Sequence, residues 1–380
     1  MAGTGAVSGI ACYTSRMGLF SRGKRGHSVA LIDIGSSSVG GALAHFADGQ
    51  QPVICHTGRI GIEKREGEPL TTSMLRALHT LSRLLVEHGA PALRAETGSG
   101  RIERILASVA SPWQETTVTS RHLEAERPFL FTRSTLARAL AELPGPAEGR
   151  IDSGRQAIAT ILNGYETGNP FGKRARRADL VMLSSTLEKA AANGIEETLR
   201  HAFHAHGVET VAFAPTAYAV FRDLYPHQKE FVMLDVTGAA TDAAFVKQGR
   251  LAQALTLPAG LDALGAGTKE LMGGSPDAER AWVDAVRAAF AEFAARNALP
   301  HAVFLLADGH AQERLKLLLE GAGFFSRLSE EPLSVIPVVP SHFARHMKTR
   351  AAGEPDPFLA LLALYYRKRL PHPAVTVEGG

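Results

Sequence analysis

The sequence is poor in cysteine, with only Cys12 and Cys55 among its 380 residues. Two cysteines cannot build a disulfide framework, and no pattern of metal ligands surrounds them. Their scarcity is typical of a reducing compartment, so we expect a cytoplasmic protein. No apolar run approaches the roughly 20 residues needed to span a bilayer. No apolar core follows the basic residues near the start, so we expect no signal peptide.

A strong excess of charge is missing as well. The formal net charge is only +3, which does not indicate a nucleic-acid partner. Hydrophobic residues make up 45% of the chain and charged residues 21%, which is typical of a globular protein of two ordinary domains. A complete dinucleotide motif is lacking too, because Gly265-Ala-Gly267 does not continue as GxGxxG.

Two stretches repeat one pattern, and Asp235 lies 202 residues after Asp33. Each stretch is an apolar run that ends in one of these aspartates and continues into a loop of small residues. A second apolar run follows in each case, then a glycine turn, at Asp48-Gly49 and Gln248-Gly249, and a third run. The spacing is too long for a solenoid repeat and suits two related half-domains.

The residue types predict the chemistry of these loops. An aspartate at the end of a buried strand needs a partner, because an unpaired carboxylate is costly in apolar surroundings, and a hard cation such as Mg²⁺ is a natural one. Small residues after it let backbone N–H groups and hydroxyls approach an anion. Two such loops facing each other predict a polyphosphate and its Mg²⁺ held from both sides. The alternative is a pair of ordinary hairpins in a duplicated fold whose site has decayed.

The two stretches resemble the phosphate-binding hairpins of the actin-like ATPase superfamily. Segments 110–113 (Ala-Ser-Pro-Trp), 162–170 (Leu-Asn-Gly-Tyr-Glu-Thr-Gly-Asn-Pro) and 214–219 (Ala-Pro-Thr-Ala-Tyr-Ala) are similar to the branch that contains PilM and FtsA. The resemblance implies an α/β fold of two duplicated, ribonuclease H-like lobes with a small inserted α+β subdomain. FtsA proteins usually end in a long membrane-targeting helix, and no such helix follows the one expected over 358–366, which favours the PilM side.

These arguments predict four regions. We expect a flexible basic leader over 1–27, and a first lobe built from 28–100, about 184–228 and a C-terminal helix over 355–370. An inserted interaction subdomain is expected over 101–183, and a second lobe over 229–345. Within the first lobe, we expect one helix that begins at Thr72 or Ser73 and ends at Gly89, and another over 187–206 that is interrupted at Gly194.

The resemblance also implies the ligands and the residues that hold them. It assigns ATP to the two loops and to the turn after the expected strand 303–307, and Mg²⁺, through water, to Asp33 and Asp235. The nucleotide-binding residues implied are Asp33, Gly35, Ser36, Ser37, Ser38, Asp235, Thr237, Gly238, Thr241, Asp242, Gly260, Asp308 and Gly309.

Several positions depart from the family pattern. Gly40 stands where many members have a lysine, Ala239 where the second loop usually has a glycine, and Asp308 where the adenosine turn has one. No residue that would orient an attacking water is evident. Weak ATPase activity is therefore the most that the motifs predict, and hydrolysis is left open.

The resemblance implies a cytoplasmic, ATP-binding platform in pilus, secretion-type or cell-division envelope machinery. Its expected partner is a short cytoplasmic segment of a PilN-like inner-membrane protein, or another component of such a machine, which would place it at the inner membrane. Self-association stays open. Two alternatives are a degenerate, non-enzymatic scaffold and a sugar or acid kinase. The basic run 173–177 indicates a solvated rim, with a docking face for an acidic partner as the alternative.

Overall fold

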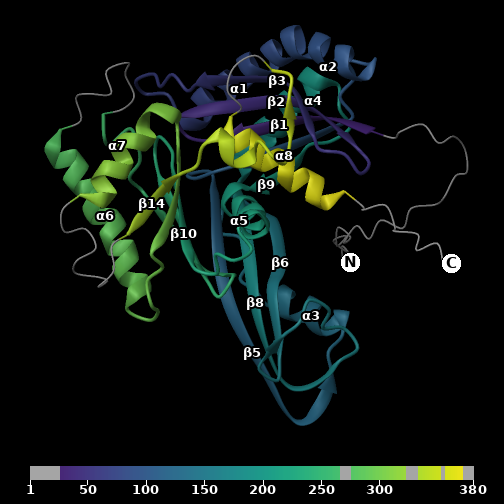
Figure 1. Cartoon of the computed structure of the whole chain (residues 1–380), viewed down its shortest axis with the longest axis vertical. Helices are drawn as coiled ribbons and strands as arrows, with labels where there is room; N and C mark the ends of the chain where they lie inside the picture. Colours follow the sequence, from purple (N-terminus) through teal and green to yellow (C-terminus); the bar gives the residue numbers. More distant parts are fainter. Residues whose placement is uncertain (1–25, 266–274, 322–332, 352–355, 371–380) are drawn as a thin grey trace, which may run out of the picture.

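The structure is a computed structural model that describes residues 26–265, 275–321, 333–351 and 356–370. Three sheets organise the described chain, two in the lobes and one in an arm that projects from them (Figure 1). Most of the expected leader, Cys12 and Gly267 lie outside the described residues.

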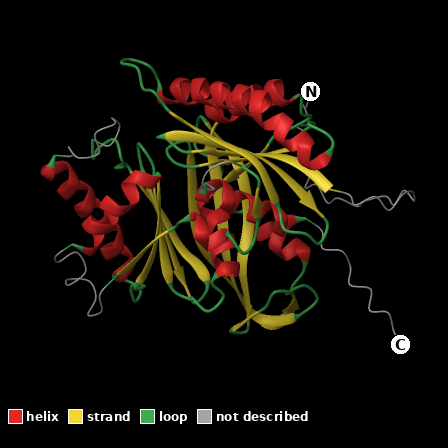
Figure 2. Ribbon diagram, turned by 45° about the horizontal axis from the view of Figure 1, so that its top comes forward, coloured by secondary structure: helices red, strands yellow, loops and turns green. Residues whose placement is uncertain are grey.

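The first lobe contains a six-stranded sheet in the order β15-β3-β2-β1-β4-β9. Helices cover one face of it (Figure 2), where Ile32 and Leu43 of the sheet pack against Leu78 and Ile195. The side chains next to these along each strand point to the opposite face of the sheet, because successive residues of a strand alternate between the two faces. The elements are β1 (Gly26–Ile34), β2 (Ser38–Ala47), β3 (Val53–Gly61), α1 (Leu70–Leu84), η1 (Leu85–Gly89), α2 (Ala90–Thr97), β4 (Arg104–Val109), α4 (Lys189–Phe203), β9 (Glu209–Ala212) and β15 (Lys348–Thr349).

The second lobe contains a five-stranded sheet in the order β12-β11-β10-β13-β14. Its outer face packs Phe245 against Trp282 and Phe290. The elements are β10 (Phe231–Val236), β11 (Thr241–Lys247), β12 (Arg250–Leu257), α6 (Pro276–Ala294), β13 (Ala302–Ala307), α7 (Gly309–Glu320), β14 (Ser334–Pro337) and η2 (Pro340–Phe343).

The two lobes repeat one strand arrangement. β1 runs antiparallel to β2 and parallel to β4, and β10 runs antiparallel to β11 and parallel to β13. Asp33 and Asp235 occupy equivalent places, one residue before the end of the central strand of each set. The duplicated α/β architecture expected from the sequence is therefore confirmed.

A shared core joins the lobes through α5 (Phe213–Leu224) and α8 (Pro357–Arg369). The ring of Phe221 on α5 lies 4.7 Å from that of Phe304 on β13, and Phe213 lies 5.5 Å from Phe358 on α8. Aromatic contacts of this kind bury large apolar surfaces from both lobes together.

The arm is a four-stranded sheet in the order β5-β8-β6-β7, with one helix against it. The elements are β5 (Gln114–Leu130), α3 (Arg133–Ala141), β6 (Arg150–Leu162), β7 (Tyr165–Glu166) and β8 (Arg174–Glu188). The inserted subdomain was expected to begin at 101, but β4 pairs in parallel with β1 and belongs to the first lobe. Residue 114, where β5 begins, is thus the first residue of the arm's sheet.

Two expectations about helices were wrong. The helix that was to end at Gly89 continues through η1 into α2, and Gly89 serves close packing instead, because a Cβ there would lie 2.9 Å from Leu43 Cδ1. Helix α4 is continuous across Gly194, where a Cβ would lie 2.5 Å from Leu75 Cδ1. Both glycines allow a close approach between elements that a local sequence pattern does not reveal.

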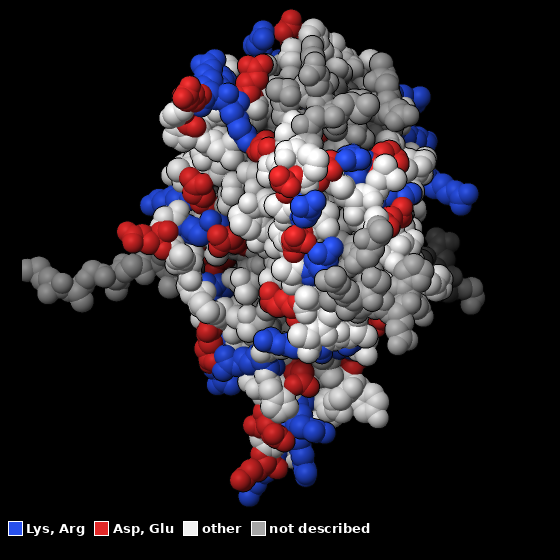
Figure 3. Space-filling view, turned by 90° about the vertical axis from the view of Figure 1, so that its left-hand side faces the viewer, with Lys and Arg blue, Asp and Glu red and all other residues white. Residues whose placement is uncertain are grey.

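The basic run 173–177 lies mostly on β8, where Arg177 pairs across the sheet with Glu124 of β5. Basic and acidic residues are interspersed over the face in Figure 3, including the tip of the arm. None of the helices that the structure describes is both long enough and apolar enough to cross a bilayer.

Candidate functional site between the lobes

The first loop leaves β1 at Asp33 and returns at Ser38, the first residue of β2. The Gly35 N–H donates to the Ser38 carbonyl at 3.1 Å, which closes a tight turn. Asp33 is buried, and its Oδ1 accepts from Ser108 Oγ at 3.0 Å. The turn therefore presents three consecutive hydroxyls, from Ser36, Ser37 and Ser38, beside a buried carboxylate.

The second loop leaves β10 after Asp235, and the Thr237 N–H donates to the Ala240 carbonyl at 2.9 Å. Thr241 and Asp242, which were expected to bind nucleotide, lie buried on β11 with partners in the protein. Thr241 Oγ1 donates to the Ala259 carbonyl at 2.7 Å and accepts from Trp282 Nε1 at 3.0 Å. Asp242 Oδ1 accepts from Ser111 Oγ at 2.7 Å and from Thr256 Oγ1 at 2.6 Å.

The two loops touch each other directly. The Ala239 N–H donates to Ser36 Oγ at 2.7 Å, and the same oxygen lies 2.8 Å from Thr237 Oγ1. A Cβ on Gly238 would lie 2.8 Å from the Ser36 carbonyl oxygen. Gly238 is thus required by the close approach of the opposite loop. Ser36 and Thr237, which were both expected to bind phosphate, are hydrogen-bonded to each other.

Gly260 supports the second loop from behind. A Cβ there would lie 2.2 Å from the Thr237 carbonyl oxygen and 2.6 Å from that of Gly238, so no side chain fits. The Leu261 N–H donates to that Thr237 carbonyl at 2.8 Å. The close approach expected of Gly260 is real, but in this structure it is made to the loop backbone.

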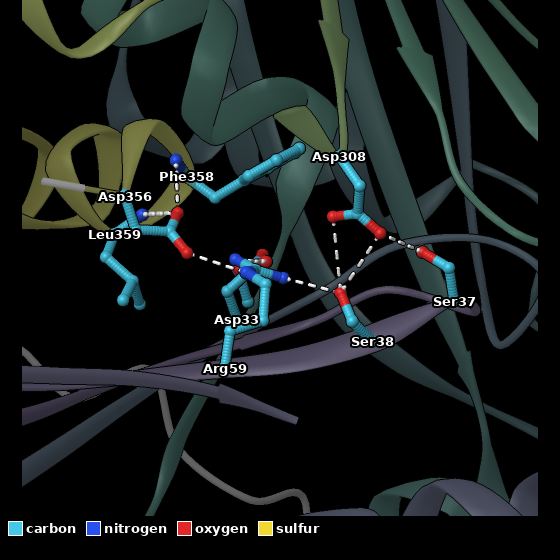
Figure 4. A network of polar contacts seen from close by, with 9 residues as sticks. Asp33, Ser37, Ser38, Arg59, Asp308, Asp356, Phe358 and Leu359 are labelled. Atoms are coloured by element: carbon cyan, nitrogen blue, oxygen red, sulfur yellow. Dashed lines mark hydrogen bonds and ion pairs between the residues drawn. The ribbon is translucent and has the colours of Figure 1, made fainter. Parts of the chain in front are cut away.

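Asp308, between β13 and α7, reaches the first loop across the interlobe boundary (Figure 4). Ser37 Oγ donates to its Oδ2 at 2.8 Å, and Ser38 Oγ lies 3.4 Å from both carboxylate oxygens. Gly309 is the first residue of α7. The adenosine turn expected from the sequence is therefore linked to the serines of the opposite lobe.

Arg59 on β3 completes the site, and the sequence reasoning missed it. Its Nη2 lies 2.9 Å from Asp33 Oδ2, its Nη1 donates to Ser38 Oγ at 2.8 Å, and its Nε lies 2.6 Å from Asp356 Oδ2 (Figure 4). Asp356 also caps α8, because its Oδ1 accepts from the Phe358 and Leu359 N–H groups at 2.9 and 3.2 Å.

A signal for Arg59 existed in the sequence. Gly40 stands where the family often has a lysine, and Gly40 pairs with Arg59 across β2 and β3. A Cβ at Gly40 would lie 2.5 Å from Arg59 Nη2. The cation is therefore supplied by β3, the strand next to β2, and a side chain at position 40 would displace the guanidinium from its present place. The signal for Asp356 was Asp356-Pro357, a common start of a helix.

Both aspartates have raised pKa values, but only Asp33 is hydrogen-bonded to a cation. Burial raises the pKa of Asp33 to about 6, although Arg59 acts against the rise. Burial raises the pKa of Asp235 well above its usual value, and the carboxylates of Asp242 and Asp33 add to the effect. Burial lowers the pKa of Arg59, but Asp356 and Asp33 outweigh it and raise the pKa overall.

Asp235 is the carboxylate of this site that has no hydrogen-bond partner. Both of its carboxylate oxygens are buried and have no hydrogen-bond partner. Such a group is costly unless it is protonated or meets a cation. Across the described ranges, no three or more His, Cys, Asp or Glu residues are arranged to hold a metal ion, so water would have to complete the coordination of a cation at Asp235.

The structure thus brings the two carboxylates, the serine loop and Asp308 to one boundary between the lobes. The fit to Mg²⁺-ATP is partial. Asp235 offers a free carboxylate, whereas Asp33 is already paired with Arg59. A phosphate could enter between Ser36 and Ala239 only if those residues separated. Binding of nucleotide by the residues named from the sequence stays a prediction.

Comparison with known proteins gives the fold. No family model matches the chain, and no curated protein matches it. A chain of the PilM–PilN type IV pilus biogenesis complex is 16% identical, with a TM-score of 0.57 over 92% of this chain and all of that one. A Bacteroides thetaiotaomicron VPI-5482 protein with an actin-like ATPase fold is 11% identical, with a TM-score of 0.43 over 90% and 96% of the two chains. The resemblance to PilM-like proteins is confirmed as one of fold: this chain shares the α/β fold of the compared chain from the PilM–PilN complex.

Proposed function

We propose that this protein is an actin-like assembly platform in an envelope machine of the pilus or secretion type. It would lie in the cytoplasm, at the inner membrane through a partner, and bind a short cytoplasmic segment of a PilN-like protein. The observation that carries the proposal is the direct closure of the lobes at the serine loop. Hydrogen bonds between Ser36 and the second loop, and between Ser37 and Asp308, hold the two lobes together. The arm projects from that body and offers a surface for assembly (Figure 1).

The fold comparison supports this proposal because the similarity extends over all of the compared chain from the PilM–PilN complex. The lobe contacts support it in a second way. A scaffold needs one stable shape, and a hydrogen bond away from water, such as that between Ser36 and Thr237, is stronger than an exposed one and helps to hold that shape. In this proposal the site holds the two lobes together and does not bind nucleotide. The protein is then the degenerate, non-enzymatic scaffold that the sequence left as an alternative.

A second candidate function is binding of ATP with Mg²⁺, and the unpartnered Asp235 favours it. The cation would neutralise charge at the phosphates. Asp235 would hold it through water, and the Ala239 N–H with the hydroxyls of Ser36 and Thr237 would donate to phosphate once the loops had separated. The proposal includes no hydrolytic step.

Partner binding tests the platform. The cytoplasmic segments of PilN-like proteins from the same genome would be made as peptides and titrated against the full chain by calorimetry. We expect one of them to bind with equal affinity in the presence and absence of millimolar Mg²⁺-ATP. Failure of every segment in both conditions would remove the proposal.

The same titration separates the two candidates. If ATP controls the platform, Mg²⁺-ATP should change the affinity for the peptide about fivefold or more, since a coupled ligand shifts its partner's binding by such factors. Mg²⁺-ATP should then also raise the melting temperature. An unchanged melting temperature at millimolar nucleotide would remove the ATP candidate and leave the platform intact.

A further inference from the structure

Asp308 occupies a position where an aspartate normally caps its own helix. It immediately precedes α7, yet its side chain makes no capping hydrogen bond there. Giving up such a cap leaves the first N–H groups of the helix without a side-chain partner, which destabilises the helix. The carboxylate instead accepts from Ser37 at 2.8 Å and lies 3.4 Å from Ser38 Oγ.

The groups around that carboxylate form a donor set for an oxyanion. Ser37 and Ser38 present hydroxyls, and the guanidinium of Arg59 holds Ser38 from behind at 2.8 Å. Arg59 is fixed in turn by Asp33 and Asp356. Hydroxyl donors on a tight turn beside a guanidinium are the groups that bind phosphoryl oxygens in proteins. Here they meet a carboxylate from the opposite lobe.

We propose that Asp308 is the internal occupant of an oxyanion seat formed by Ser37, Ser38 and Arg59, and that its carboxylate takes the place of a phosphoryl group while joining the lobes. The seat would accept the phosphoryl group of a polyphosphate only after Asp308 leaves it. Because Asp33, Asp235 and Asp356 lie around the seat, the phosphoryl ligand would arrive with a divalent cation. The inference rests on the proposed closed platform and names the residue that keeps it closed.

The test uses the full chain and two substitutions of Asp308. Asp308→Asn keeps the size of the side chain and removes its charge. Asp308→Ser leaves room in the seat and can cap α7, so it should fold even if the asparagine variant does not. Each protein is titrated calorimetrically with tripolyphosphate and, in a separate arm, with ATP, both with Mg²⁺.

We expect both variants to bind Mg²⁺-tripolyphosphate at least about tenfold more tightly than the wild type, which is a change of about 1.4 kcal/mol. Adding Ser37→Ala to either variant should abolish the gain. A gain with ATP and none with tripolyphosphate would still place a phosphoryl group in the seat and would show that the nucleoside contributes. Asp262→Asn is the matched control, because Asp262 joins the lobes through Lys64 and does not touch the serines. It should leave affinity for either ligand unchanged.

Equal affinity of the wild type and both Asp308 variants for either ligand would overturn the inference and reduce Asp308 to a structural link. The same conclusion would follow if the Ser37→Ala addition left the gain intact. Neither result bears on the peptide titration, so failure of the seat and failure of the platform remain distinguishable.

Discussion

At the scale of single residues, the two equivalent aspartates have different roles. Asp33 has two partners, the Arg59 guanidinium and the Ser108 hydroxyl, whereas both oxygens of Asp235 have none. Two positions related by duplication have therefore diverged in what their surroundings provide. The difference comes from Arg59, which reaches Asp33 from β3 across the intervening strand β2, and from Ser108 on β4, since the equivalent position beside Asp235 is Leu306.

The unpaired carboxylate predicts a stabilising substitution. The pKa of Asp235 is raised, so the folded state holds this proton more firmly than the unfolded chain does. Stability from this group is present below the unfolded pKa of about 4 and is lost as the pH rises. Asp235→Asn avoids that loss, so we expect it to be more stable than the wild type by about 1 to 3 kcal/mol near neutral pH, with the difference disappearing in acid.

Urea unfolding over a range of pH, in a chelator and without added metal, measures this difference. If the asparagine variant were less stable than the wild type at neutral pH, Asp235 would have a partner after all. Repeating the measurement with Mg²⁺ checks for a cation: selective stabilisation of the wild type would favour the ATP candidate.

Substitution of Arg59 is expected to destabilise the protein, in contrast to Asp235→Asn. Arg59→Met leaves Asp33 and Asp356 without their cation, and removal of one member of a buried ion pair typically costs about 3 to 5 kcal/mol. The side chain of Arg59 is 24% exposed, so we expect a loss at the lower end of that range, about 3 kcal/mol, measured by chemical denaturation.

Arg250→Met is the matched control for Arg59. Arg250 pairs with Glu166 at 2.7 Å, but Glu166 is largely exposed, and such pairs contribute at most about 1 kcal/mol. Equal losses from the two substitutions would contradict the central position that the structure assigns to Arg59.

At the scale of elements, the glycines of the site serve contacts between pieces of backbone. The turn at Gly35 closes the first loop, Gly238 admits the opposite loop, and Gly260 lies against the second loop. The family resemblance named all three as nucleotide-binding residues, which stays a prediction. Their contacts were not predictable, since Gly238 meets Ser36, about 200 residues earlier in the chain, and Gly260 meets the second loop through Thr237 and Gly238.

Gly260 gives the prediction at this scale. A Cβ in Gly260→Ala would press on backbone atoms of Thr237 and Gly238, which cannot move aside as a flexible side chain can. We expect a loss of about 3 kcal/mol, at the upper end of the usual cost of overpacking, in thermal or chemical unfolding. Gly61→Ala is the control, because a Cβ there meets no atom within 4 Å and should leave stability nearly unchanged. A mild effect at Gly260 would show that the second loop can shift to make room.

At the scale of the whole molecule, the arm has a hydrophobic core of its own. Phe131 and Ala139 pack with Leu162, Leu180 and Met182, while α5 and α8 join the two lobes through a separate core. Regions with separate cores often open independently. Leu183 of β8 packs into the core shared by the lobes, so we expect the outer part of the arm, around Phe131, to lose structure while the lobes remain folded.

Phe131→Ala tests that independence. Loss of a buried phenylalanine typically costs about 3 to 5 kcal/mol, and we expect hydrogen exchange to increase in β5, α3 and β8. Exchange in β1 and β10 should stay as in the wild type. Phe245→Ala in the second lobe is the comparison and should increase exchange in β10 and β11 while sparing the arm. A uniform increase across the chain for Phe131→Ala would mean that arm and lobes unfold as one unit.

The sequence by itself determined the duplicated architecture and the place of the two loops. Apolar runs that end in Asp33 and Asp235 are local patterns, and a strand followed by small residues forms its turn from its own chemistry. The second apolar run of each stretch and the glycine turns were likewise predictable from period and turn residues.

Only the tertiary structure decided what the loops contact. It brought Ser36 to Ala239, aimed Asp308 at the serines and placed Arg59 over Gly40. It also assigned β4 to the first lobe, since parallel pairing joins strands that are far apart in the chain. The physical reason is common to all of these contacts: a local pattern sets how a segment folds, whereas the partner of a buried polar group is chosen by how separate segments pack together.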